Sequence, residues 1–146
     1  MTGVIYVYYT CHLLRRKSMK EYPRMPDSEF AVMQIIWAQP VPISKLQVSA
    51  LAEPQKGWTH QTVYTLLSRL TERGFLSSEK QGKERYYTAL VSRETYLNQE
   101  TSRFMKAVHK NSLTGLMNAL FANNKPNEED LSELEQWLKE KNEGRK

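Results

Sequence analysis

The stretch from Gly57 to Tyr87, GWTHQTVYTLLSRLTERGFLSSEKQGKERYY, constrains the fold of this chain more than any other. Thr59 is a favourable N-cap residue, and the apolar residues after it recur at the i, i+3, i+4 and i+7 spacing of a helix with one buried face. These apolar residues are Val63, Leu66, Leu67 and Leu70. Gly74 follows where many helices end in a left-handed glycine. The sequence therefore predicts a helix that begins after Thr59 and ends at Gly74.

Two β-rich runs, Phe75–Glu79 and Arg85–Leu90, come directly after this helix. The basic turn Lys80-Gln81-Gly82-Lys83 joins them, which is the pattern of a β-hairpin. A helix followed by a hairpin with a basic tip predicts a winged helix-turn-helix. The predicted fold class is mainly α, with a small β-hairpin wing.

The outer face of the predicted helix is polar and nearly uncharged. Exposed helices usually carry Lys and Glu, whereas Gln, Thr, Ser and Tyr can reach base edges and phosphates when a helix lies in the major groove. The residues on this face and its flanks are Gln61, Thr62, Tyr64, Thr65, Ser68 and Arg69, and we predict that they bind DNA. The competing interpretation is a polar surface helix without a ligand.

The net charge of +5 is distributed unevenly along the chain. Residues 1–24 carry five Lys and Arg against one Glu, so the basic character is mostly N-terminal. Within residues 56–85, six basic residues nevertheless outnumber three acidic ones. Phosphate contacts are made by the charges on one face, so a local cluster matters more than the total. Lys80, Lys83 and Arg85 in the wing complete the predicted DNA-binding set.

Other classes of function find little support in the composition. No run approaches the roughly 20 apolar residues of a membrane span, so no membrane partner is expected. The single Cys11 cannot form an intramolecular disulfide, and a cytoplasmic location is therefore expected. No Cys/His cluster has metal-ligand spacing, and no catalytic set of side chains falls on adjacent predicted elements. We predict no metal, no cofactor and no enzymatic activity.

Two further helices are predicted before the Gly57–Tyr87 stretch. The first lies within residues 25–40, with Asp27 or Ser28 as its cap. The second covers residues 43–52. Its expected core-facing residues are Ile43, Leu46, Ala50 and Leu51. Together with the third helix and the hairpin, these elements predict a winged domain over residues 25–91.

Residues 92–146 are predicted to form three amphipathic helices. About 50 residues in three helices enclose little core of their own, so we expect their apolar faces to pack against a second copy of the chain. The predicted dimerisation residues are Leu97, Phe104, Val108, Leu113, Leu116, Met117, Leu120, Leu134 and Trp137. The alternative is that the helices pack back onto the winged domain.

Residues 1–24 resemble neither segment that follows them. Arg15-Arg16 can be encoded by AGG-AGG, the core of a bacterial ribosome-binding site, at a normal spacing before Met19. We therefore expect residues 1–18 to be translated control DNA and to be disordered. The alternatives are a genuine basic arm and a membrane-surface anchor.

Three segments together resemble the BlaI/MecI penicillinase-repressor family. They are DSEFAVMQIIW, GWTHQTVYTLLSRLTERGFL and GKERYYTALVSRE. They match the family's D-x-E-x-x-V-M-x-x-x-W opening, its W-[ST]-x-x-T-[VI]-x-T-L-[LI]-x-R-L recognition helix and its Y-Y wing strand. The resemblance covers roughly residues 25–142. The chain lacks the C-terminal Cys-x-Cys motifs of the related copper-responsive CopY repressors, and copper sensing through thiolates is not expected.

The resemblance implies a dimeric repressor of an inverted-repeat operator that controls β-lactam resistance and its own gene. It implies DNA contacts by Thr59, Gln61, Thr62, Tyr64 and Thr65. Family repressors are inactivated by proteolysis at an Asn-Phe bond, when a membrane sensor-transducer detects a β-lactam. The matching positions here are Arg103 and Phe104, where Arg replaces Asn. The alternatives are a winged helix that binds another protein and a repressor that answers a different signal.

Overall fold

The computed structural model describes residues 20–145. Its elements are α2 (Asp27–Trp37), β1 (Ile43–Ser44), α3 (Lys45–Lys56), α4 (His60–Glu72), β2 (Leu76–Gln81), β3 (Glu84–Ala89), α5 (Arg93–His109), α6 (Leu113–Leu120) and α7 (Glu128–Glu143). The chain divides into two compact units, the first ending at Glu100 and the second beginning at Thr101. This division comes later than the expected boundary after residue 91, because the start of α5 contributes Tyr96 to the core of the first unit.

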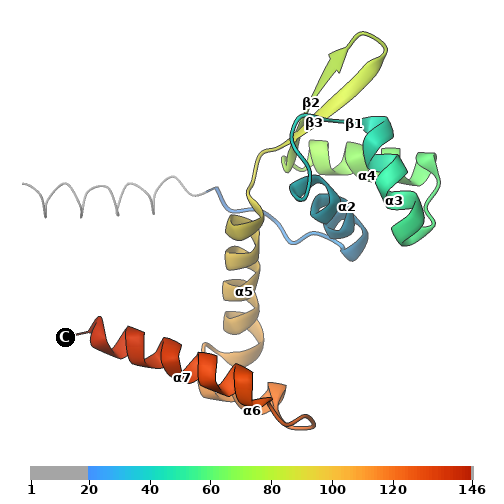
Figure 1. Cartoon of the computed structure of the whole chain (residues 1–146). Helices are drawn as coiled ribbons and strands as arrows, with labels where there is room; N and C mark the ends of the chain where they lie inside the picture. Colours follow the sequence, from blue (N-terminus) through green and yellow to red (C-terminus); the bar gives the residue numbers. More distant parts are fainter. Residues whose placement is uncertain (1–19, 146) are drawn as a thin grey trace, which may run out of the picture. The chain divides into compact units, whose positions relative to one another are not determined.

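The first unit is a winged helix-turn-helix, as predicted. Helices α2, α3 and α4 pack together, and the hairpin of β2 and β3 projects from them (Figure 1). The sheet is antiparallel, with strand order β1-β3-β2. Strand β1 is a correction, because Ile43 pairs with Tyr87 of β3 and does not begin a helix.

Both predicted ends of α4 are confirmed. The Thr59 hydroxyl caps the first turn by accepting the backbone N–H of Thr62 at 3.3 Å. At the other end Gly74 has a φ of +84°, and the next residue, Phe75, donates its N–H to the Leu70 carbonyl at 3.0 Å. This hydrogen bond closes a Schellman motif, which needs a left-handed residue where glycine stands. The helix therefore turns directly into the first wing strand.

Helix α3 differs from its prediction at both ends. It begins after Ser44, whose hydroxyl and the side chain of Gln47 form a reciprocal capping box. It also continues through Pro54 and ends at Gly57, whose φ is +66°. Pro54 stands in the last turn, so its missing N–H removes only one hydrogen bond close to the helix end.

The buried face of α3 also differs from the prediction. Leu46 is 54% exposed and Ala50 is exposed, whereas Val48 and Ala52 are fully buried. Ile43 is buried as expected, but it belongs to a strand. The burial of Ile43 therefore does not determine which face of α3 is buried.

Helix α2 has no side-chain cap, which corrects the expected role of Asp27 or Ser28. Its N-cap residue is Pro26, whose carbonyl accepts the N–H of Phe30 at 2.9 Å. The side chain of Glu29 is instead buried, and its Oε2 accepts a hydrogen bond from Arg73 Nη1 at 2.9 Å. A buried carboxylate is retained only when it is paired, and this pair ties α2 to the end of α4.

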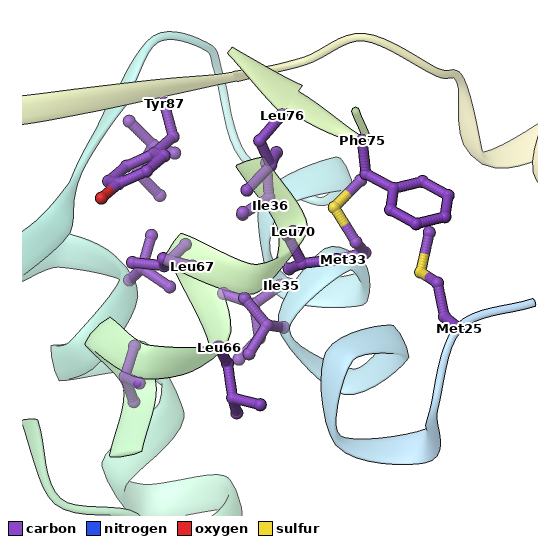
Figure 2. Close-up of a cluster of buried hydrophobic side chains, with 14 of the residues drawn as sticks. Met25, Met33, Ile35, Ile36, Leu66, Leu67, Leu70, Phe75, Leu76 and Tyr87 are labelled. Carbon is purple, nitrogen blue, oxygen red and sulfur yellow. The ribbon is translucent and has the colours of Figure 1, made fainter. Parts of the chain in front are cut away.

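The core of the first unit gathers side chains from helices, strands and the segment before α2. Figure 2 shows this cluster, in which Met25 and Met33 lie near Phe75 and Leu67 lies below Tyr87. Fully buried members include Met33, Ile36, Leu67, Leu70 and Phe75. The four predicted core residues of α4 are all buried. The predicted apolar stripe is therefore confirmed.

The stability of the first unit is expected to fall at alkaline pH through Tyr87. Burial raises the pKa of this phenol above its ordinary value of 10.0, while the nearby Arg85 guanidinium acts in the opposite direction. The unfolded chain therefore loses this proton first, and the contribution of Tyr87 to stability is lost as pH rises above about 10. Denaturant titrations of Tyr87→Phe should show a shallower loss of unfolding free energy above that pH than the wild type. An identical slope in the two proteins would contradict the assignment.

The segment before α2 packs on the core. Tyr22 is buried and stacks on Phe75 with ring centroids 5.5 Å apart. Its backbone N–H donates to Gln99 Oε1 at 3.0 Å, and Gln99 Nε2 donates to the Lys20 carbonyl at 2.9 Å. The structure therefore differs from the expected N-terminal extension at residues 20–24. The expectation for residues 1–18 falls outside the described residues.

The second unit consists of helices, as predicted. Ser112 caps α6 by accepting the N–H of Gly115 at 3.0 Å, and Asn127 caps α7 by accepting the N–H of Asp130 at 2.6 Å. Neither α6 nor α7 contains a buried residue. This unit therefore exposes most of the apolar surface that its helices carry.

Candidate nucleic-acid interface

The polar side chains of α4 lie on the face opposite its buried stripe. Gln61, Thr62, Thr65, Ser68 and Arg69 are all exposed, whereas Tyr64 is half-buried. Each buried residue of α4 lies in the core, so the helix cannot rotate without exposing that stripe. The structure therefore presents on one side of α4 the residues of this helix that are predicted to bind DNA.

Hydrogen bonds in the first turns of α4 limit the donors and acceptors that Thr59 and Thr65 can offer to a ligand. The Thr65 hydroxyl donates to the Gln61 carbonyl at 2.9 Å, so it keeps only acceptor capacity and a methyl group for a ligand. The Thr59 oxygen is occupied by its capping bond and lies 3.1 Å from the Thr62 hydroxyl. The free amide of Gln61 offers both donors and an acceptor, the combination that matches an adenine edge.

Two neighbouring side chains hold the ring of Tyr64, and neither contact is predicted above. The Lys45 ammonium lies 3.7 Å from the centroid of the Tyr64 ring. The His60 ring lies 6.0 Å away, and its Nδ1 is hydrogen-bonded to the buried hydroxyl of Ser49. His60 and Tyr64 are four residues apart on one helix, which is a local signal. Lys45 comes from α3, and no spacing rule could have linked it to Tyr64.

The wing places cations directly opposite one another. Lys80 of β2 pairs with Arg85 of β3, and Lys83 lies in the turn between the strands. All three are exposed. Arg85 Nη1 donates to Ser78 at 2.8 Å, which leaves further N–H groups of its guanidinium for a ligand. Like charges on opposed residues destabilise a hairpin, and a bound phosphate would relieve that repulsion.

The polar and cationic side chains of this surface suit the binding of a polyanion. Within residues 20–145 no group of three or more His, Cys, Asp and Glu side chains could hold a metal ion. Over the same range, none of the helices is long and apolar enough to cross a membrane. A polar helix and a cationic wing in one unit match the needs of duplex DNA, which offers base edges in a groove and phosphates beside it.

The predicted dimerisation residues are mostly exposed. Phe104, Val108, Leu113, Leu120 and Trp137 have exposed fractions between 46% and 59%. Leu116, Met117 and Leu134 are partly buried. Leu97 differs, because it packs against the core of the first unit. Arg103 and Phe104, the predicted cleavage positions, lie inside α5.

An apolar groove lies between α6 and α7. It has a volume of about 550 Å³, and its lining is mainly Leu113, Met117, Leu134, Trp137 and Leu138, with two acidic side chains beside them. Contiguous exposed apolar surface of this kind marks an interaction site. The groove is therefore the second candidate interface of the chain.

Comparisons with known proteins cover most of the chain. A family model described as penicillinase repressor matches residues 25–140. The penicillinase repressor of Bacillus licheniformis is 27% identical over 122 residues, which are 84% of this chain and 94% of that protein. The methicillin resistance regulatory protein MecI of Staphylococcus aureus is 25% identical over 115 residues, which are 79% of this chain and 93% of that protein.

Two solved structures are similar to about half of the chain. The solution structure of the DNA-binding domain of the repressor BlaI is 31% identical, with a TM-score of 0.48, and spans 53% of this chain and 94% of that one. The solution structure of monomeric Bacillus licheniformis BlaI in complex with the blaP half-operator is also 31% identical, with a TM-score of 0.46 and the same coverage.

Proposed function

The chain belongs to the penicillinase repressor family, and on that premise we propose that it represses transcription as a homodimer bound to an inverted-repeat operator. The membership confirms the predicted family, and the family's description as a repressor agrees with the prediction of a regulator rather than an enzyme. The observation that carries the proposal is the exposed polar face of α4 beside the cationic wing. The genes under its control are proposed to include a β-lactam resistance gene and its own.

The proposed base readout uses α4, and the proposed phosphate contacts use the wing. Gln61, Tyr64, Thr65 and Ser68 would face base edges, and Thr59, Thr62 and Arg69 would lie at the sides of the groove. Lys80, Lys83 and Arg85 would neutralise phosphates. The division follows the chemistry of the side chains, since amides and phenols discriminate bases whereas ammonium groups attract any phosphate.

Two substitutions test this division. Gln61→Ala should lower affinity for the preferred duplex by roughly 1–3 kcal/mol and relax the preference at particular base pairs. Lys83→Ala should weaken all duplexes alike and make the plot of log affinity against log salt shallower by about one unit. Fluorescence anisotropy with preferred and random duplexes at several salt concentrations measures both effects. An equal loss on the two duplexes for Gln61→Ala would remove its role in readout.

The rival function is a winged helix that binds another protein. Such a module should bind duplex DNA no better than a basic control protein of similar charge, and selection from a random DNA pool should yield no common sequence. A footprint over an inverted repeat supports the repressor instead. The same selection supplies the operator for every later experiment.

The proposed homodimer forms through the second unit. The apolar stripes of α6 and α7 are exposed in the single chain, and burying them stabilises an assembly by about 25 cal/mol for each Å² covered. A second copy is the occupant that supplies a matching apolar face by symmetry. Two half-sites of an inverted repeat require the same two-fold symmetry. Every member of the predicted set except Leu97 is retained in this proposal, because only Leu97 packs against the core of the first unit.

The signal that releases the operator is proposed to act on α5. The Arg103-Phe104 bond is enclosed in a helix, so a protease reaches it only after local unwinding. Arg103 stands where the resemblance implies Asn, which alters the residue before the bond. This difference favours the alternative of a repressor that answers another protease or another signal than the family's sensor-transducer.

A further inference from the structure

Lys45 has an unusual position for a cation near a DNA-binding surface. It is the first residue of α3, and its side chain is half-buried. Among the described residues it forms no ion pair. Its ammonium instead lies over the Tyr64 ring of α4, 3.7 Å from the centroid. That distance is well inside the range of about 6 Å in which a cation is attracted by an aromatic face.

A second contact holds the same ring from within α4. The His60 imidazole lies 6.0 Å from the Tyr64 ring, with an angle of 38° between the planes. His60 itself is anchored, because its Nδ1 is hydrogen-bonded to Ser49, a side chain of α3 that is 1% exposed. Helix α3 therefore contacts the first two turns of α4 through Ser49 and Lys45.

These contacts restrict the rotamer of Tyr64 before any ligand binds. A phenol can donate or accept one hydrogen bond at a base edge, and it gains specificity when its orientation is set in advance. A mobile ring would lose that freedom on binding and would tolerate more than one base. The half-buried state of Tyr64 agrees with a ring that is already held.

We propose that Lys45 is a positioning residue for base readout, which acts through Tyr64 and not through a phosphate. The inference rests on the proposed function, because it assigns to Lys45 a part in operator recognition. Lys45 determines specificity by holding the ring, and Ser49 with His60 supports the same orientation. A lysine at the start of the first helix of a helix-turn-helix would otherwise be taken for a backbone contact.

The test compares Lys45→Met with Lys56→Met in the full chain. Both changes remove one positive charge from α3, but Lys56 is exposed at the far end of that helix. The wild-type chain first selects its preferred duplex from a random pool. The ratio of affinities for preferred and random duplexes is then measured for each variant, together with the salt dependence.

Lys45→Met is expected to lower this ratio by about fivefold, the loss of a cation–π contact of roughly 1 kcal/mol. The loss should fall on the same base pairs as that of Tyr64→Leu, and Lys45→Met should add nothing further in the Tyr64→Leu background. Lys45→Arg should restore most of the ratio, because a guanidinium also binds an aromatic face. Lys56→Met should leave the ratio unchanged.

The contact itself can be measured without DNA. The ring current of Tyr64 should shift the ε-methylene protons of Lys45 upfield of those of Lys56, and Tyr64→Leu should abolish the shift. The proposal is overturned if that shift is absent, if Lys45→Met behaves like Lys56→Met, or if its effect adds to that of Tyr64→Leu. If the wild-type chain selects no preferred duplex, the proposed function itself fails and this inference fails with it.

Discussion

Leu120→Arg is expected to lower affinity for the full inverted repeat by about a hundredfold to ten-thousandfold, while affinity for a single half-site stays nearly unchanged. Leu120 is 55% exposed in α6, so the substitution costs the single chain little. In the proposed dimer the same position is covered, and a buried unpaired guanidinium prevents association. Each winged domain then loses the effective concentration that its partner supplies.

Sedimentation at micromolar concentration and anisotropy with full and half-operators measure the two consequences of Leu120→Arg. Asn118→Arg is the matched control, because it adds the same charge to the polar side of the same helix. Leu116→Arg should also dissociate the dimer, although Leu116 is partly buried and its replacement also disturbs the second unit. A wild-type chain that sediments as a monomer, or a Leu120→Arg protein that remains dimeric, would contradict the proposed interface.

Leu67→Ala is expected to destabilise the first unit by about 3–5 kcal/mol, the cost of lost burial together with an unfilled cavity. Leu67 is fully buried in α4 and lies in the cluster of Figure 2. A domain of this size has a stability of only about 5–15 kcal/mol, so the loss is a large part of the total. Operator binding should fall with the folded fraction.

Leu46→Ala is the control for Leu67→Ala. It removes the same atoms from α3, but Leu46 is 54% exposed, so its cost should stay within about 0.5 kcal/mol. Urea denaturation followed by tryptophan fluorescence measures both free energies. Equal losses for the two variants would show that the buried face of α3 is the one expected from the sequence, with Leu46 directed inward.

The sequence by itself determined those features whose causes lie within a few neighbouring residues. Helix α4 is the clearest example, because its cap at Thr59, its apolar stripe and its left-handed glycine at Gly74 act within single turns. The wing and the amphipathic helices of the second unit follow from the same short-range patterns. The exposed polar face of α4 follows as well, since once one side of the helix is buried the opposite side is exposed.

Only the tertiary structure decided the contacts between residues far apart in the chain. Ile43 lies in a strand because the edge of β3 was available to pair with it. Helix α3 therefore starts later and buries a different face from the one predicted with Ile43 as its first core residue. Tyr22 lies in the core because its ring stacks on Phe75 and its backbone N–H donates to the side chain of Gln99. Such partners are selected by packing and by the satisfaction of buried polar groups, which no local periodicity encodes.

The contact between Lys45 and Tyr64 is a long-range contact of this kind at the candidate site. Locally, Lys45 is only the first residue of α3, and Tyr64 is only a residue on the side of α4. Their approach to 3.7 Å depends on the angle at which α3 crosses α4. That angle is set by the shared core, to which Val48 and Ala52 of α3 and the buried stripe of α4 belong. The sequence therefore determined which residues of α4 are exposed, and the packing of two helices decided how one of them is held.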